Sequence, residues 1–224
     1  IGNFCRIRCY PWYWFCISKE IAREYISNLR RILCLRSDIT FLQEPIDSFA
    51  EANFNGHSFN PLAHVYNGAP EDFVVSQCYF AKVLATQMMN APRSRFIISD
   101  RYLGSCEHFV RVKRKRNELG FYPNNYVQDY VKNAKQATVE NVRVHKFTQK
   151  LLFVLDTPLI TCLDRIKSRQ RCVEMGKSDE FWLEYNNQLR DSLLTERDPS
   201  FTMMVCPTPE DVTNTILEVV GHSI

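Results

Sequence analysis

Glycine is scarce in this sequence. Only 7 of its 224 residues are glycine, and none lies between Gly2 and Gly56. A phosphate-binding loop needs glycines, because its backbone N–H groups must approach the phosphates more closely than side chains allow. A glycine-rich loop of the usual kind is therefore excluded between residues 3 and 55.

Long apolar runs and paired cysteines are also missing. The longest runs, such as LLFVLD at 151–156, are far too short to cross a bilayer, so we expect no membrane partner. The first residues lack the pattern of a secretory signal. The nine cysteines are scattered, odd in number and without a CxxC pair. We therefore expect reduced thiols in an intracellular, cytoplasmic protein, with a mitochondrial or viral origin left open.

The charge is mild and the composition is that of a globular protein. A formal net charge of +3 fits a phosphate binder, but it does not argue for a nucleic-acid partner. Hydrophobic residues make 45% of the chain and charged residues 24%, and no repeat or low-complexity linker is visible. We expect one domain over residues 1–224, in which residues 1–17 are atypical.

Apolar segments of strand length recur along the chain without the alternation of half-exposed strands. Segments with apolar residues at helical spacing separate them. Buried strands that alternate with helices indicate an α/β fold, in which helices cover both faces of a parallel sheet. The expected strands are 38–45, 95–102, 150–158 and 201–207, and the expected helices are 19–34, 71–89, 103–118, 159–171 and 209–220.

Polar residues follow two neighbouring strands of this pattern. Glu44-Pro45 comes after the first strand and Asp100-Arg101 after the next. Ligands of open parallel sheets bind at the carboxyl ends of the strands. There Glu44 can accept a proton from a substrate hydroxyl, Asp100 can hold Mg²⁺, and Arg101 can brace Glu44 and contact a phosphate. A loop glutamate before a turn proline, and an ion pair that caps a strand, are the simpler interpretations.

The stretch DRIKSRQRCVEMG, residues 164–176, concentrates arginines. Arg165 and Arg169 share one helical face, and Arg171 lies near the end of that helix. Arginines that converge on one crevice suit phosphoryl transfer, in which charge builds on the transferring group. Glu174 can fold back toward a sugar hydroxyl. An exposed basic helix explains the same pattern without a site.

The stretch VYNGAPEDFVVSQCYF, residues 65–80, offers groups that suit a nucleobase. Tyr66 and Gln77 can serve one, because an amide presents both a donor and an acceptor to a base edge. Phe73, Phe80 and Phe109 can supply a stacking face. Aromatic residues at helical spacing are, however, more often part of the core.

The motifs LQEPIDSF, VYNGAPEDFVVSQCYF, ISDRYLGSCEHFV and DRIKSRQRCVEMGKSDEFWLEY occur in one order, over roughly residues 40 to 220. In this arrangement the chain resembles the deoxynucleoside kinase family. The resemblance implies a P-loop-NTPase-like parallel sheet with helices on both faces and an arginine-rich lid. It implies transfer of the ATP γ-phosphoryl group, with Mg²⁺, to a deoxynucleoside 5′-hydroxyl in nucleotide salvage and DNA precursor synthesis. Thymidine or deoxycytidine is the expected substrate, and a homodimer is the expected assembly.

The resemblance also implies a role for each candidate residue. Glu44 takes the place of the catalytic base, and Asp100-Arg101 that of the acidic residue and arginine near the metal. Tyr66 and Glu174 match ligands of the sugar 3′-hydroxyl, and Gln77 matches the glutamine that pairs with the base. The lid arginines that clamp the phosphates are matched by Arg165, Arg169 and Arg171.

Three residues depart from the family pattern in the body of the chain. Tyr102 replaces a serine, Leu84 replaces an expected arginine, and Cys106 stands where members carry aspartate or alanine. They leave the base preference open.

The phosphate loop is the gravest departure, and two alignments of it are open. The opening Gly2-Asn3-Phe4 resembles that of the family and puts Arg8 and Cys9 in the places of the loop lysine and serine. Alternatively, Ser18-Lys19 stands nearer the usual end of the loop. The codons of WYWF, residues 12–15, give glycines when read one base later, so a frameshift over an ancestral loop is a further hypothesis.

Two rival functions follow from these departures. The first is a catalytically inactive relative that acts as a nucleoside-binding or interaction module. The second is a nucleoside monophosphate kinase, which shares the core, although Glu44 and Gln77 suit a nucleoside better than a nucleotide.

Overall fold

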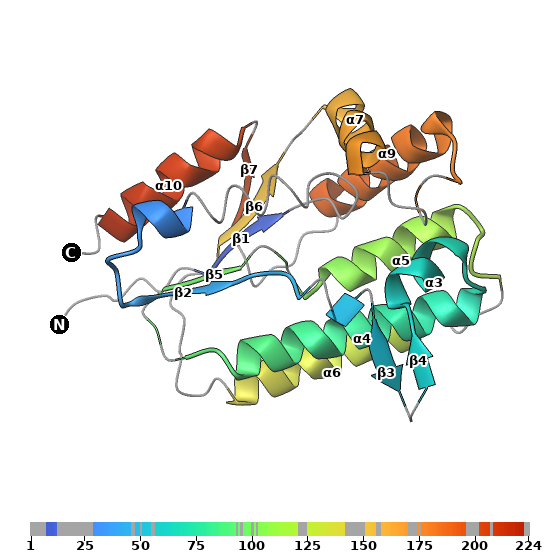
Figure 1. Cartoon of the computed structure of the whole chain (residues 1–224), viewed down its shortest axis with the longest axis horizontal. Helices are drawn as coiled ribbons and strands as arrows, with labels where there is room; N and C mark the ends of the chain where they lie inside the picture. The colour runs from blue at the N-terminus through green and yellow to red at the C-terminus, as the bar shows by residue number, and fades with distance from the viewer. Residues whose placement is uncertain are drawn as a thin grey trace.

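The computed structural model describes residues 8–12, 29–45, 48–49, 51–54, 57–92, 94, 96–99, 101, 103–120, 125–141, 151–155, 158–169, 174, 176–195, 202–206 and 208–221. A five-stranded sheet in the order β2-β5-β1-β6-β7 forms its centre (Figure 1). Every neighbouring pair in it is parallel. Its strands are β1 (Arg8–Trp12), β2 (Ile39–Leu42), β5 (Phe96–Ser99), β6 (Leu151–Leu155) and β7 (Thr202–Cys206).

Apolar side chains leave this sheet on both faces. All four residues of β5 are buried. Ile97 belongs to one hydrophobic cluster, whereas its neighbours Phe96 and Ile98 belong to another. Because successive side chains of a strand point to opposite faces, a sheet covered on both sides needs continuous apolar strands. This is why the sequence shows apolar runs without alternation.

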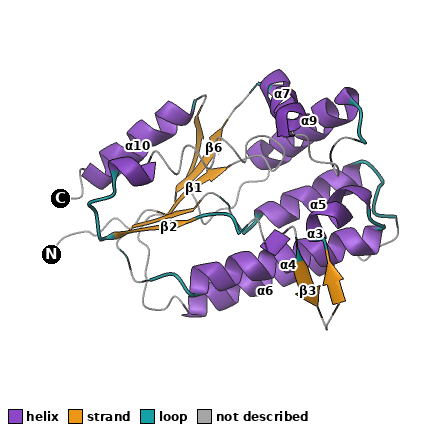
Figure 2. Ribbon diagram, in the orientation of Figure 1, coloured by secondary structure: helices purple, strands orange, loops and turns teal. Residues whose placement is uncertain are grey.

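Helices cover both faces (Figure 2). On one face, Leu29 and helix α10 (Pro209–Gly221) pack against Phe96, Ile98 and Phe153. The larger cluster on the other face draws on six helices. These are α3 (Pro61–Asn67), α4 (Pro70–Met89), α5 (Ser105–Lys115), α6 (Tyr126–Asn141), α7 (Leu159–Arg169) and α9 (Asp179–Thr195).

A short hairpin and a tight turn lead into the longest helix. Strands β3 (Ala52–Phe54) and β4 (His57–Phe59) pair antiparallel before α3. Gly68 then joins α3 to α4, and a Cβ added there meets the carbonyl oxygen of His64 at 2.7 Å. Proline begins α4, and the Asp72 carboxylate accepts a hydrogen bond from the N–H of Ala69 at 3.1 Å. The turn therefore fixes how the end of α3 meets α4.

The predicted α/β fold is confirmed. Helices α3, α6 and α9 and the hairpin β3–β4 were not expected from the sequence. The four expected strands have counterparts in β2, β5, β6 and β7, and four of the expected helices in α4, α5, α7 and α10. Most of the expected helix 19–34, and the expected end of the helix 159–171, lie outside the described residues.

The central strand β1 was also not expected from the aromatic segment that contains it. It places Arg8 and Cys9 inside the sheet, paired with Ile97 and Ile98. The alignment that puts these two residues in a phosphate loop is therefore wrong, because a loop must follow the strand.

Among the residues with a described position, no helix is long and apolar enough to cross a membrane.

Candidate functional site

Glu44 and Arg101 meet at the carboxyl edge of the sheet. Strands β2 and β5 are neighbours, with Leu42 opposite Ser99, and each candidate lies two residues beyond the end of its strand. The Arg101 Nη1 donates a hydrogen bond to the Glu44 Oε1 at 2.5 Å. The parallel register thus brings together two residues that are 57 positions apart in the sequence.

Arg101 is a buried cation held from several sides. Only 5% of its surface is exposed. Its Nε donates to the Ser105 Oγ at 3.2 Å, and its guanidinium lies 5.0 Å from the ring centroid of Phe49 and 5.3 Å from that of Phe80. A buried charge is costly unless it is paired, and aromatic faces attract cations. The two rings, Ser105 and Glu44 therefore fix the guanidinium in one place.

The phenylalanines considered for base stacking have other contacts. Phe80 packs on Phe49, with ring centroids 4.4 Å apart. Phe109 stacks on Tyr185 at 6.4 Å, and Lys113 lies over the ring of Phe73. All three are buried in the core. The stacking face therefore stays a prediction, and the contacts of Phe49 and Phe80 with Arg101 were not foreseen.

Gln77 is a buried amide on α4. It is 1% exposed, and its Oε1 has no hydrogen-bond partner among the residues that the structure describes. Leaving such an acceptor unpaired in the interior costs free energy, whereas a ligand donor or a water can satisfy it. Gln77 is thus suited to receive a polar group.

Cys106 lies close to Arg101 and Ser105. Burial raises the pKa of its thiol, although the nearby Arg101 works in the opposite direction. The side chain is fully buried and remains neutral at ordinary pH. Leu84 is also buried in this core, so neither departure from the family pattern introduces a charge beside Gln77.

Tyr66 and Glu174 lie near the start of α9. Tyr66, at the end of α3, is 7% exposed and makes an edge contact with Trp182 at 5.4 Å. Glu174 is 1% exposed, and its carbonyl oxygen accepts a hydrogen bond from the N–H of Lys177 at 3.4 Å. A carboxylate so deep in the protein requires polar partners.

The remaining candidates are only partly placed. Arg165 and Arg169 lie on α7, one turn apart, but their side chains fall outside the described part of the structure. Asp100 and Arg171 lie outside the described residues altogether. Within the residues that are described, no group of three or more histidines, cysteines or carboxylates can hold a metal ion.

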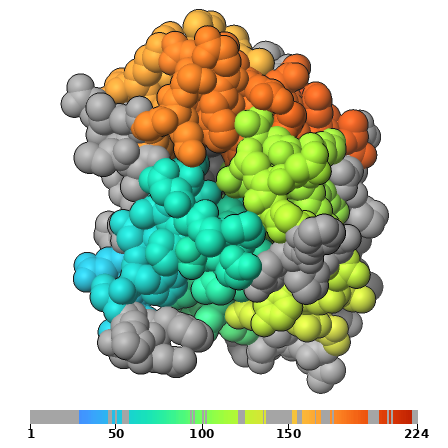
Figure 3. Space-filling model, turned by 90° about the vertical axis from the view of Figure 1, so that its right-hand side faces the viewer, coloured from blue at the N-terminus to red at the C-terminus, as the bar shows by residue number. Residues whose placement is uncertain are grey.

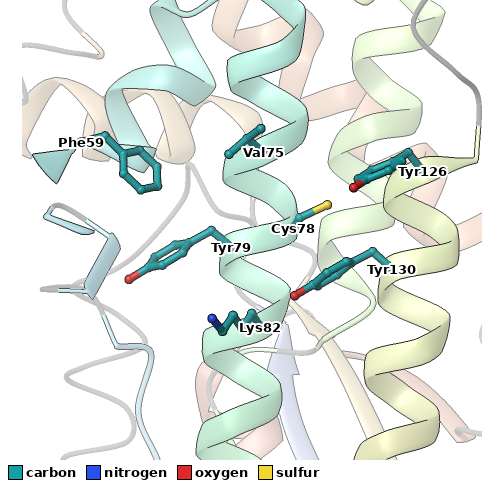
Figure 4. Close-up of a pocket in the computed structure, with 7 residues that line it drawn as sticks. All are labelled: Phe59, Val75, Cys78, Tyr79, Lys82, Tyr126 and Tyr130. Carbon is teal, nitrogen blue, oxygen red and sulfur yellow. The ribbon is translucent and has the colours of Figure 1, made fainter. Parts of the chain in front are cut away.

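A separate hollow lies between α4 and α6, at some remove from this chemistry (Figure 4). Its volume is about 210 Å³. Neither Glu44 nor Arg101 contributes to it. Its lining is largely aromatic, with Lys82 the charged member: Phe59, Val75, Cys78, Tyr79, Lys82, Tyr126 and Tyr130.

Comparison with known proteins identifies the fold. No family model matches the sequence, and no curated protein is detectably similar to it. Deoxyadenosine kinase from M. mycoides with bound dCTP is a structural match with a TM-score of 0.67 and 17% identity, covering 97% of this chain and 99% of that chain. The same enzyme with bound dATP matches with a TM-score of 0.64 and 17% identity, over 96% and 99%. The chain has the deoxynucleoside kinase fold.

A third structure agrees with these two. The M. mycoides enzyme with the products dCMP and a flexible dCDP bound has a TM-score of 0.63 and 16% identity, covering 97% of this chain and 98% of that chain. The deoxynucleoside kinase fold is a P-loop NTPase fold, in which the phosphate loop follows the first strand of the sheet. In this chain the residues that follow β1, from Tyr13 on, lie outside the described residues.

Proposed function

We propose that this chain is an ATP-dependent deoxynucleoside kinase that phosphorylates the 5′-hydroxyl of a deoxynucleoside. The observation that carries the proposal is the Glu44–Arg101 pair at the carboxyl edge of the parallel sheet. This edge is where open α/β sheets bind their ligands. The buried Gln77 and Glu174 supply polar groups for a base and a sugar. The M. mycoides kinases of the same fold were solved with deoxynucleotides bound.

In the proposed reaction Glu44 takes the proton of the 5′-hydroxyl. Arg101 keeps its carboxylate oriented and stabilises the negative charge that develops nearby. The Glu44 side chain is 15% exposed, whereas the Arg101 side chain is only 4% exposed. A hydroxyl can therefore approach the carboxylate from the solvent side. The lid arginines Arg165, Arg169 and Arg171 are proposed to hold the phosphates.

ATP and Mg²⁺ are the proposed donor and cofactor. Mg²⁺ is usually bound by one or two carboxylates together with substrate phosphates, and not by a cage of protein ligands. Asp100 is the proposed ligand of such a site. When bound, the ion neutralises phosphate charge.

A second function has a specific observation in its favour. The sequence has no glycine from residue 3 to residue 55, which is where a phosphate loop is required. An inactive relative that keeps Gln77 and Glu174 binds a nucleoside without binding ATP. Such a chain is a nucleoside-binding or interaction module.

Calorimetry separates the two proposals. ATP with Mg²⁺, thymidine and deoxycytidine are each titrated into the unchanged chain. Binding of ATP and of one nucleoside supports the kinase, and a turnover assay then compares the chain with Glu44→Gln, which is expected to lose activity. Nucleoside binding without ATP supports the binding module. If no ligand binds, both proposals fail.

The proposal also includes a homodimer and an intracellular location. Sedimentation at micromolar concentration tests the homodimer, because it gives the mass of the particle in solution. The five cysteines whose side chains are described, Cys34, Cys78, Cys106, Cys162 and Cys206, are free thiols, in keeping with an intracellular location.

A further inference from the structure

Two cations lie close to the ring of Phe181, in the first turn of α9. The Arg116 guanidinium is 4.7 Å from its ring centroid, and the Lys177 Nζ is 5.4 Å from it. The face of an aromatic ring carries negative potential, so each cation is attracted to it. Phe181 also stacks on Tyr185 at 5.7 Å with an interplanar angle of 15°. The ring is thus held from several directions.

Arg116 is itself anchored at the end of α5. Its Nε contacts the Glu118 Oε1 at 2.5 Å, and its Nη1 contacts the Glu184 Oε2 on α9 at 2.9 Å. Figure 3 shows the face on which α9, in orange, meets α5, in light green, and the teal residues of α3 and α4. Phe181 therefore joins the end of α5 to the start of α9.

Both proposed ligands of the sugar are attached to this junction. Lys177, which covers the ring of Phe181, also donates its N–H to the Glu174 carbonyl oxygen. Trp182 follows Phe181, packs against it at 5.2 Å and meets Tyr66 at 5.4 Å. Glu174, through Lys177, and Tyr66, through Trp182, are thus both connected to Phe181.

From this geometry we infer that Phe181 is a positioning residue for recognition of the sugar 3′-hydroxyl. Its ring, held by contacts with Arg116 and Lys177, sets the start of α9 and with it the position of Glu174 relative to Tyr66. The inference rests on the proposed function, because it assigns these two residues to the sugar. Phe181 acts through them and does not touch the ligand.

The test compares nucleosides that differ only at the 3′ position. Thymidine and deoxycytidine, each with its 3′-deoxy analogue, are titrated into the unchanged chain and into Phe181→Leu. Leucine retains an apolar side chain but removes the ring face. We expect affinity for the 3′-hydroxyl nucleoside to fall about tenfold and affinity for the 3′-deoxy analogue to change less than about twofold.

Two further variants separate positioning from general damage. Lys177→Gln leaves the core intact and should reduce the same preference by about threefold. Phe59→Leu replaces a half-buried ring beside the α4–α6 hollow and should leave both affinities unchanged. Thermal unfolding shows whether each variant is folded, and Lys177→Gln carries the test if Phe181→Leu is not.

The outcomes are distinct. Selective loss of the 3′-hydroxyl preference in Phe181→Leu or Lys177→Gln supports the inference. Equal loss for both nucleosides, or no loss, overturns it and leaves the proposed function standing. If the unchanged chain binds no nucleoside, the proposed function fails, and the inference fails with it.

Discussion

Replacing Glu44 by glutamine should destabilise the protein in a way that depends on Arg101. The side chain of Arg101 is 4% exposed and that of Glu44 is 15% exposed, so the variant leaves a buried guanidinium without its carboxylate. Breaking a buried ion pair by removing one partner costs about 3–5 kcal/mol. The amide oxygen still accepts a hydrogen bond, and the rings of Phe49 and Phe80 still cover the cation.

The expected loss in the free energy of unfolding is therefore about 2–3 kcal/mol, below that range. An unfolding entropy of about 2.1 cal/mol/K per residue over this chain converts it to a fall in Tm of about 4–6 °C. Urea denaturation gives the free energy, and calorimetry gives the Tm.

A double-mutant cycle with Arg101→Met assigns the loss to the pair. Methionine fills the space between the two rings without a charge, so Glu44→Gln should cost less in that background, with a coupling energy of about 1.5–3 kcal/mol. The half-buried pair Arg36–Asp38, whose side chains are 25% and 31% exposed, is the more solvated control, and Asp38→Asn should cost less than about 1 kcal/mol. A loss below about 0.5 kcal/mol with no coupling would show that the pair is solvated, and the reasoning would be refuted.

Three smaller changes test the described structure at other places. Asn186 is fully buried, and its two amide atoms have no hydrogen-bond partner within the described part of the chain. Asn186→Leu should therefore raise the free energy of unfolding, measured by urea denaturation, by about 1 kcal/mol, whereas Asn187→Leu at an exposed position should change it little. Gly68→Ala should cost about 1–3 kcal/mol in the same assay, because its Cβ meets the His64 carbonyl oxygen at 2.7 Å; a neutral result would mean that the turn adjusts freely. Burial raises the pKa of Cys78 to about 12, so the folded protein keeps this thiol protonated while the unfolded chain ionises near pH 9. Stability should fall as pH rises from about 9 toward 12, and Cys78→Ser should make that fall shallower; an identical pH dependence would contradict the burial of the thiol.

The sequence predicts the sheet well because its strands are buried on both faces. Runs such as FIIS and LLFVL carry that signal in their own residues. Strand β1 carries no such signal, because RCYPW contains a proline and no β-branched residue. Its pairing with β5 and β6 makes it a strand, and pairing between distant segments is not visible in a local pattern. The hairpin β3–β4 was missed because its strands have only three residues each.

The candidate site shows a similar division. Glu44 and Arg101 could be predicted to meet, because parallel strands bring their carboxyl ends to one edge. The partners of Arg101 could not be predicted, because Phe49 and Phe80 have the same apolar pattern whether they cover a cation, fill a core or stack on a base. Phe181 is a parallel case. Arg116 is distant from it in the sequence, and Lys177 precedes the start of α9 at Asp179, so helical spacing does not identify either cation as a partner of the ring. Aromatic residues can be located by periodicity, but their partners depend on the packing of separate helices.

The position of β1 has a consequence for the choice between kinase and binding module. Since Arg8 and Cys9 are part of the central strand, the alignment in which they replace the loop lysine and serine fails. The alignment that ends in Ser18-Lys19 remains, and it has the right order, with strand first and loop after it. That segment has aromatic residues where backbone N–H groups need open access to phosphates. The proposed nucleoside site thus has buried polar residues in its favour, whereas the proposed ATP site depends on a segment that lacks glycine, the residue type best suited to it. The proposed kinase activity therefore requires that residues 13–19 bind phosphate, and ATP binding is the property that decides between the two proposals.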